Sequence, residues 1–249
     1  MTAFDTTPGL PRSDYFATTR WTVVVQAGQR SSPQSARALA ELCETYWYPL
    51  YCYVRRRVAS REDAEDLVQG YFERFVEQND LEHLSADRGR FRAFLLASMK
   101  HFMANQRDKA GRQKRGGGQP VFSLDWQDAD TRFQLEPADP GANPEQEFDR
   151  HWALALLERV VHRLRDECAA DGKAELFRHT KGFLTFNESA IPHAEAAEAL
   201  GWSEGAVRVA VHRLRQRYRT LLREEIAQTL VDPGQIADEL RSLLAALTG

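Results

Sequence analysis

Apolar residues recur at spacings of three and four along three long stretches of the chain, 38–57, 63–77 and 90–109. This spacing places them on one face of an α-helix, and the alternation typical of a β-strand is hard to find anywhere in the sequence. The 249 residues are 43% hydrophobic and 28% charged, which is typical of a globular chain that can bury such faces in a core. The pattern therefore predicts an all-α protein.

A change of composition after residue 110 predicts two helical domains. Residues 111–143 contain three consecutive glycines at 116–118, prolines at 120, 137 and 140, and an excess of acids from residue 123 onward. Such a segment is typical of a flexible linker. We therefore expect a helical domain at 16–110, a flexible acidic linker at 111–143, a second helical domain at 144–225 and a C-terminal helical extension at 226–249, which is broken at 232–234.

The charged residues are segregated along the chain, so the net charge of −3 conceals basic surfaces. Residues 88–119 carry nine basic residues and one acid, whereas residues 123–150 carry eight acids and two arginines. Residues 205–223 carry six arginines and no acid. Local basic blocks of this kind favour contact with nucleic acid, whatever the overall charge.

The segment from His193 to Leu222 has the spacing of a helix-turn-helix. Ala197 provides a small residue where two helices touch, Gly201 is free to adopt a positive φ in the turn, and Val207 is an apolar anchor on the second helix. Ser203 is well placed to cap that second helix. The pattern therefore predicts two short-linked helices of which the second can enter a major groove.

The second of these helices carries an apolar face beside a basic one. Val207, Val211 and Leu214 recur at helical spacing, and so do Arg208 and Arg215 on a neighbouring face. A solvated helix in an ordinary bundle is the alternative, but such helices usually mix both signs of charge. Arginines on an exposed helix face can contact phosphates or guanine, so the pattern favours DNA binding.

Two further motifs lie in the N-terminal half, and the second is more specific than the first. The acids of the segment 60–75 follow Ser60, and Ser60 with Asp63 can form a capping box, so helix capping is an alternative to partner binding. In the segment 89–117, phenylalanines interleave with basic residues, which is typical of surfaces for unstacked bases. We expect most of these phenylalanines in the core and the basic end in contact with phosphates.

In this order, the motifs resemble the extracytoplasmic-function (ECF, group IV) RNA polymerase sigma factors of the sigma-70 family. The resemblance covers about residues 18–108, as the family's region 2 bundle, and 148–223, as its region 4 helix-turn-helix. It implies that the chain binds core RNA polymerase, at the β′ clamp helices and the β flap, and directs promoter recognition and melting. It also implies promoter DNA as a partner, and allows an anti-sigma factor or a kinase-linked regulator.

The resemblance carries three sets of residues onto this sequence. Those implied to face the polymerase clamp are Asp63, Glu65, Asp66 and Gln69. Those implied to lie toward the −10 element are Arg92, Lys100, His101, Asn105, Arg107, Arg112 and Arg115. Those implied to lie at the −35 element are Ser203, Glu204, Arg208, His212, Arg213, Arg215 and Arg217. The C-terminal extension lies beyond the family pattern, and its amphipathic residues suggest regulation through a surface for region 2, polymerase or an effector.

Other classes of function are less favoured. A stand-alone helix-turn-helix regulator explains 197–217 but leaves the N-terminal motifs without a role, and a protein that sequesters polymerase is a third reading. An enzyme is the weakest candidate, because the sequence has no phosphate-binding loop, catalytic triad or metal cluster. We therefore expect no catalytic residue, metal or cofactor. The three scattered cysteines and the absence of a signal peptide or membrane span predict a reducing, cytoplasmic location without membrane insertion.

Overall fold

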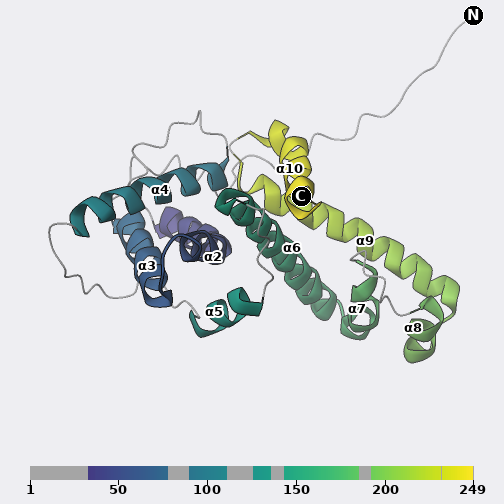
Figure 1. Ribbon diagram of the computed structural model, residues 1–249. Coiled ribbons are helices and arrows are strands. Elements are labelled where there is room, and N and C mark those ends of the chain that lie inside the picture. Colours follow the sequence, from purple (N-terminus) through teal and green to yellow (C-terminus); the bar gives the residue numbers. More distant parts are fainter. Residues whose placement is uncertain are drawn as a thin grey trace, which may run out of the picture.

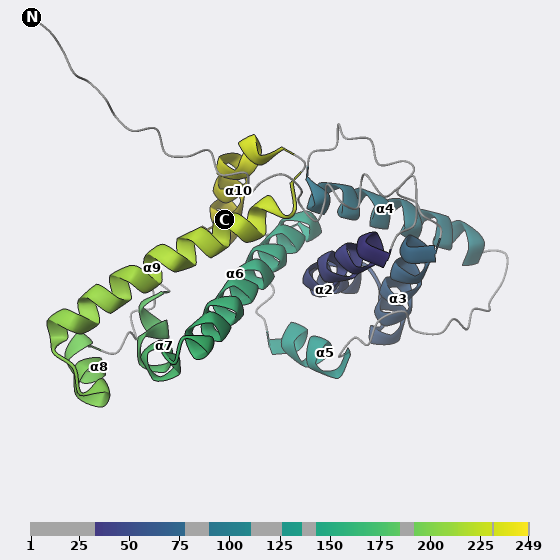
Figure 2. The ribbon, with the colours of Figure 1, turned by 180° about the vertical axis from the view of Figure 1, so that it is seen from behind.

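The computed structural model describes residues 33–77, 90–110, 126–135, 143–184, 192–230 and 232–248. Its regular elements are helices, and within the described residues no strand occurs, which confirms the predicted all-α class. The helices are arranged in an elongated molecule, as Figures 1 and 2 show from two sides. They are α2 (Pro33–Arg55), α3 (Arg61–Glu77), α4 (Phe91–Ala110), α5 (Trp126–Leu135), α6 (Pro144–Ala170), α7 (Ala174–Thr180), η4 (Lys181–Phe183), α8 (His193–Leu200), α9 (Glu204–Ala227), η5 (Pro233–Gln235) and α10 (Ile236–Thr248).

An aromatic core holds α2, α3 and α4 together and includes the first half of α6. Tyr46, Phe72 and Phe91 are fully buried there, and Trp152 of α6 donates its indole N–H to the Tyr46 hydroxyl at 3.0 Å. Buried aromatic rings contribute large apolar areas, and the indole needs such an acceptor when it is buried. The first half of α6 therefore belongs to the core of the N-terminal bundle, although its sequence lies beyond the linker.

Helix α6 continues from this bundle into a second core. Asn143 caps its start by accepting hydrogen bonds from Glu145 and Gln146, in a complete capping box. Farther along, Val160 and Leu164 pack with Leu221 of α9 in a separate apolar cluster. One long helix thus contributes to the cores of both halves of the molecule.

Within the expected linker at 111–143, residues 126–135 form the short helix α5, which packs on α2. The hydroxyl of Tyr51 donates to Asp130 at 2.9 Å, and burial raises the pKa of Tyr51, so this group stays a donor. The guanidinium of Arg132 lies over the ring of Tyr48 at 4.5 Å, and that of Arg56 lies over Phe133 at 4.6 Å. Cation–π contacts and one buried hydrogen bond hold this short helix in place, despite its proline-rich flanks.

The C-terminal extension folds back onto α4 and α6. The predicted break at 232–234 is confirmed, since η5 separates α9 from α10. Leu243 is buried, and Ile236 and Leu240 pack against the same core, whereas Leu244 is exposed. The backbone N–H of Phe91 also donates to the carbonyl of Thr229 at 3.1 Å. Folding therefore accounts for most of the amphipathic pattern of the extension. None of the helices in the described ranges is long and apolar enough to cross a membrane.

Candidate nucleic-acid interface

Helices α8 and α9 form the helix-turn-helix that the sequence predicts. Gly201 ends α8 with φ 65° and ψ 30°, a left-handed conformation in which glycine has no steric cost. The Ser203 hydroxyl accepts from the Ala206 N–H at 3.2 Å and so caps α9. Ala197 packs with Val207 and Val211 in a small core between the two helices. The predicted turn, cap and anchor are all confirmed.

The outward face of α9 presents cations to solvent. Arg208 is exposed and pairs with Glu204 at 2.6 Å, one turn earlier on the same helix. His212 and Arg213 are exposed in the next turn, while Val207, on the opposite face, is fully buried. A salt bridge between exposed groups is weak and breaks easily, so Arg208 is available to a ligand. These three side chains occupy the half of α9 that follows the turn, where a recognition helix contacts base edges.

Two other arginines of the predicted −35 set are placed differently, because they bind groups within the protein. Arg215 donates through Nε to the carbonyl of Phe183 at 2.9 Å. Arg217 binds Glu167 through two hydrogen bonds of 2.7 Å, and these bonds lower the pKa of the Glu167 carboxyl. Both arginines fasten α9 to the elements beneath it, Arg215 through Nε alone and Arg217 through its whole guanidinium.

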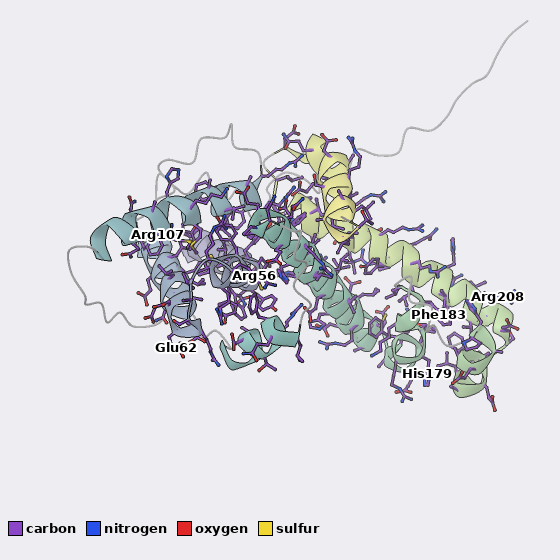
Figure 3. All side chains as sticks on the ribbon, in the orientation of Figure 1. Arg56, Glu62, Arg107, His179, Phe183 and Arg208 are labelled. Atoms are coloured by element: carbon purple, nitrogen blue, oxygen red, sulfur yellow. The ribbon has the colours of Figure 1, made fainter. Side chains whose placement is uncertain are left out.

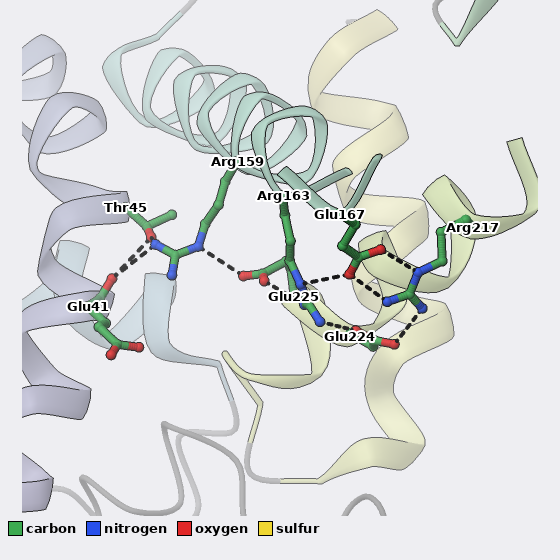
Figure 4. A network of polar contacts seen from close by, with 8 residues as sticks. All are labelled: Glu41, Thr45, Arg159, Arg163, Glu167, Arg217, Glu224 and Glu225. Atoms are coloured by element: carbon green, nitrogen blue, oxygen red, sulfur yellow. Dashed lines mark hydrogen bonds and ion pairs between the residues drawn. The ribbon is translucent and has the colours of Figure 1, made fainter. Parts of the chain in front are cut away.

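The pair of Arg217 and Glu167 belongs to a longer network between α2, α6 and α9, drawn in Figure 4. Glu225 is buried and binds Arg159 at 3.1 Å and Arg163 at 3.0 Å. Arg159 also donates to the hydroxyl of Thr45 on α2 at 3.0 Å. Because a buried carboxylate needs such partners, this network fixes the C-terminal half of α9 against the bundle.

The acidic cluster predicted to face polymerase lies on the first turns of α3. The Ser60 hydroxyl accepts from the Asp63 N–H at 3.0 Å, which confirms the predicted capping role of that serine. Asp63 and Asp66 are exposed, whereas Glu65 pairs with Arg61 and Gln69 donates to Glu73. Of the four residues predicted for this contact, the two aspartates therefore have the most access to a partner, and Glu62 beside them is also exposed.

Arg92, expected from the sequence to lie toward the −10 element, lies inside the protein. Its side chain is 10% exposed and binds Glu239 of α10 through hydrogen bonds of 2.6 Å and 3.1 Å. It also binds Asp149, and its guanidinium lies 4.5 Å from the centre of the Trp152 ring. Although burial lowers the pKa of Arg92, Glu239 and Asp149 raise it above its ordinary value. Because two carboxylates and an indole ring enclose its charge, Arg92 contributes to the stability of the fold.

Four other residues of the −10 set lie farther along α4, on its exposed side. His101, Asn105 and Arg107 are exposed, and Lys100 pairs with Glu145 in an exposed ion pair. Most phenylalanines of this helix are buried, as predicted. Arg112 and Arg115 lie outside the described residues. A small pocket of about 60 Å³ lies between α3 and α4, and its lining includes Tyr71, Arg74, Phe75, Ser98, His101 and Asn105.

The two basic surfaces lie at opposite ends of the molecule. Figure 3 shows Arg107 near the end of α4, beside the bundle, and Arg208 at the far tip of α9. Figures 1 and 2 show α8 distant from α3 and α4 in both views. This separation lets one chain contact two sites on a nucleic acid at the same time.

Sequence reasoning missed two exposed apolar side chains at the helix-turn-helix. Trp202 is 45% exposed in the turn, and Val209 is 51% exposed on α9. Both contribute to an apolar groove of about 760 Å³ beside α9, which α6 and α7 also line. Position 209 lies about 160° around the helix from Val207, and this offset could have identified the valine as outward-facing.

No group of His, Cys, Asp and Glu in the described part of the chain could hold a metal ion.

Comparison with known proteins assigns the family. The family model of the ECF sigma factor matches residues 25–224. No curated protein and no solved structure matches the chain. The family match covers both basic surfaces and the helix-turn-helix, so this chain belongs to the ECF sigma factors and its role is that of a sigma factor in transcription initiation.

Proposed function

We propose that this protein binds core RNA polymerase through the exposed acids of α3 and directs promoter recognition and melting. In this proposal, α9 enters the major groove of the −35 element, and the exposed end of α4 contacts the −10 element. Melting is driven by binding energy to the unpaired strand, so the chain needs no nucleotide hydrolysis of its own.

The observation that carries the proposal is the outward face of α9. Arg208, His212 and Arg213 are exposed there, on a helix that a glycine turn and a serine cap hold at the tip of the molecule. Exposed arginines on such a helix can pair with guanine or bind phosphates. The position of α4 at the opposite end supports contact with a second promoter element by the same chain.

The acids of α3 support the polymerase contact. Ala64 and Val68 of this helix are buried, whereas Asp63 and Asp66 are exposed. The acidic face therefore points to solvent and takes no part in the packing of the bundle. Complementary charge steers such encounters and contributes to their specificity.

Run-off transcription with purified core polymerase tests the proposal. The protein is added to core on a library of promoters from its own genome, and we expect transcripts that appear only in its presence. Specific binding of duplex DNA without polymerase, together with no transcript, would instead favour a stand-alone helix-turn-helix regulator. Binding to core without any transcript would favour a protein that sequesters polymerase.

A charge reversal tests the role of α3. Asp63→Lys with Asp66→Lys is expected to weaken core binding roughly tenfold or more, because like charges placed against a partner that attracts acids cost at least about 1.4 kcal/mol. Asp238→Lys with Asp166→Lys is the matched control, since it reverses the same number of exposed acids elsewhere on the chain. Equal core affinity for the reversed protein and the control, measured by fluorescence anisotropy, would exclude the contact.

A further inference from the structure

The outward line of α9 has an apolar centre. On a helix of 3.6 residues per turn, Gly205, Val209, His212 and Gln216 lie opposite the buried residues Val207, Val211 and Leu214. All four are exposed, and Val209 keeps 51% of its surface exposed. An aliphatic side chain therefore lies at the middle of the face that we propose to enter the major groove.

Folding explains a valine at this position only in part, because Val209 borders the apolar groove between α9, α6 and α7 but stays half-exposed. A β-branched side chain is a poorer helix former than alanine or arginine, because its rotamers are restricted against the preceding turn. Half-exposed in the folded chain, Val209 gains only part of the free energy that burial of an aliphatic side chain supplies. A ligand that covers the side chain supplies the remaining apolar contact.

The neighbours of Val209 indicate which ligand fits. Arg208 and Arg213 lie on its two sides around the helix, so the apolar centre is flanked by two cations, and His212 follows it within one turn. Gly205 lies one turn earlier, and nothing comes within 4 Å of the place where a Cβ would stand. A glycine in the first turn weakens the helix but lets another molecule approach the backbone closely.

We infer that Val209 reads a thymine in the −35 element by contact with the C5-methyl group of that base. The thymine methyl is the apolar group that the major groove displays, and it lies among the acceptors and phosphates that cations bind. Arg208, positioned by Glu204 at 2.6 Å, then contacts an adjoining guanine or phosphate. The inference rests on the proposed function, because it requires α9 to lie in the major groove.

Removal of a single methyl group tests the inference. Each thymine of a −35 element that the holoenzyme uses is replaced in turn by deoxyuridine, which lacks only the methyl, and the affinity of the holoenzyme for the duplex is measured. With the wild-type protein, one such replacement is expected to weaken binding about fourfold, which corresponds to about 0.8 kcal/mol for one buried carbon. With Val209→Ala, the same replacement is expected to have no effect, whereas Val209→Ile retains the preference for thymine.

The controls separate this inference from the proposed function. Leu244→Ala removes an aliphatic side chain that is also exposed, on α10, and is expected to keep the wild-type preference for thymine. The inference is overturned if Val209→Ala discriminates thymine from uracil as the wild type does, or if no thymine responds in the wild type. A loss of core affinity in Val209→Ala would overturn it in favour of a protein contact. If the wild-type holoenzyme shows no dependence on any −35 sequence, the proposed function itself fails.

Discussion

Replacement of Glu239 by leucine is expected to lower the free energy of unfolding by about 3 kcal/mol, the low end of the range for breaking a buried ion pair. Glu239 is 1% exposed and binds both Arg92 and Arg90, at 2.6 Å and 3.2 Å. The leucine fills a similar volume, so the loss comes from the unpaired guanidinium of Arg92 and not from a cavity. Asp149 remains as a partner of Arg92, so we expect a loss of stability at the low end of the range for a broken buried ion pair.

A double-mutant cycle isolates the interaction. Arg92→Leu alone leaves Glu239 buried with Arg90 as its remaining partner, and we expect a similar loss of stability. The double variant replaces both charges with apolar groups, so its loss should be far smaller than the sum of the two single losses. Asp238→Ala is the matched control, because the pair of Asp238 and Arg241 is exposed and should contribute at most about 1 kcal/mol.

Urea unfolding followed by circular dichroism and tryptophan fluorescence measures these differences, and Trp152 reports directly from beside Arg92. For a chain of this length, about 3 kcal/mol also corresponds to a fall of roughly 6–12 °C in Tm. The reasoning is refuted if Glu239→Leu unfolds within about 1 kcal/mol of the wild type, since about 3 kcal/mol is expected for an unpaired buried charge. Additive losses in the double variant would equally refute it.

Three further predictions concern the helix-turn-helix. Gly201→Ala should cost about 1 kcal/mol in urea unfolding, because alanine is strained at a positive φ; nothing crowds a Cβ at this position, so a larger loss would contradict strain as the cause. Ser203→Ala should cost about 1 kcal/mol through the lost cap, while Ser203→Asp retains stability, and equal stability of all three proteins would exclude a capping role. Glu167 has a pKa below its ordinary value of 4.5, so its stabilising effect is present above pH 4.5 and is lost as the pH falls through the lower folded-state pKa. The Tm difference between wild type and Glu167→Gln should therefore shrink in thermal melts between pH 6 and pH 3, and a constant difference would contradict the linkage.

Much of the candidate site could be predicted because it depends on neighbours in the sequence. The turn needs only Gly201 at the end of one helix and Ser203 at the start of the next, and both act within a few residues. The face of α9 that packs into the hydrophobic core follows from helical spacing alone. Helix α5 lies where the sequence suggested a flexible linker. It forms because Tyr51 and Arg56 of α2, far away in the sequence, provide contacts that the composition of the linker does not indicate.

The sequence by itself determined the helical class, the helix-turn-helix and the two basic blocks, since periodicity, capping and charge are local properties. Only the tertiary structure decided which arginines are available. Arg92 and Arg208 both stand in basic, amphipathic segments, yet Arg92 is enclosed by Glu239, which lies 147 residues away, and Arg217 is bound by Glu167, 50 residues away. Whether a charge serves folding or a ligand depends on partners brought together in space, because an ion pair forms wherever the folded chain places opposite charges together.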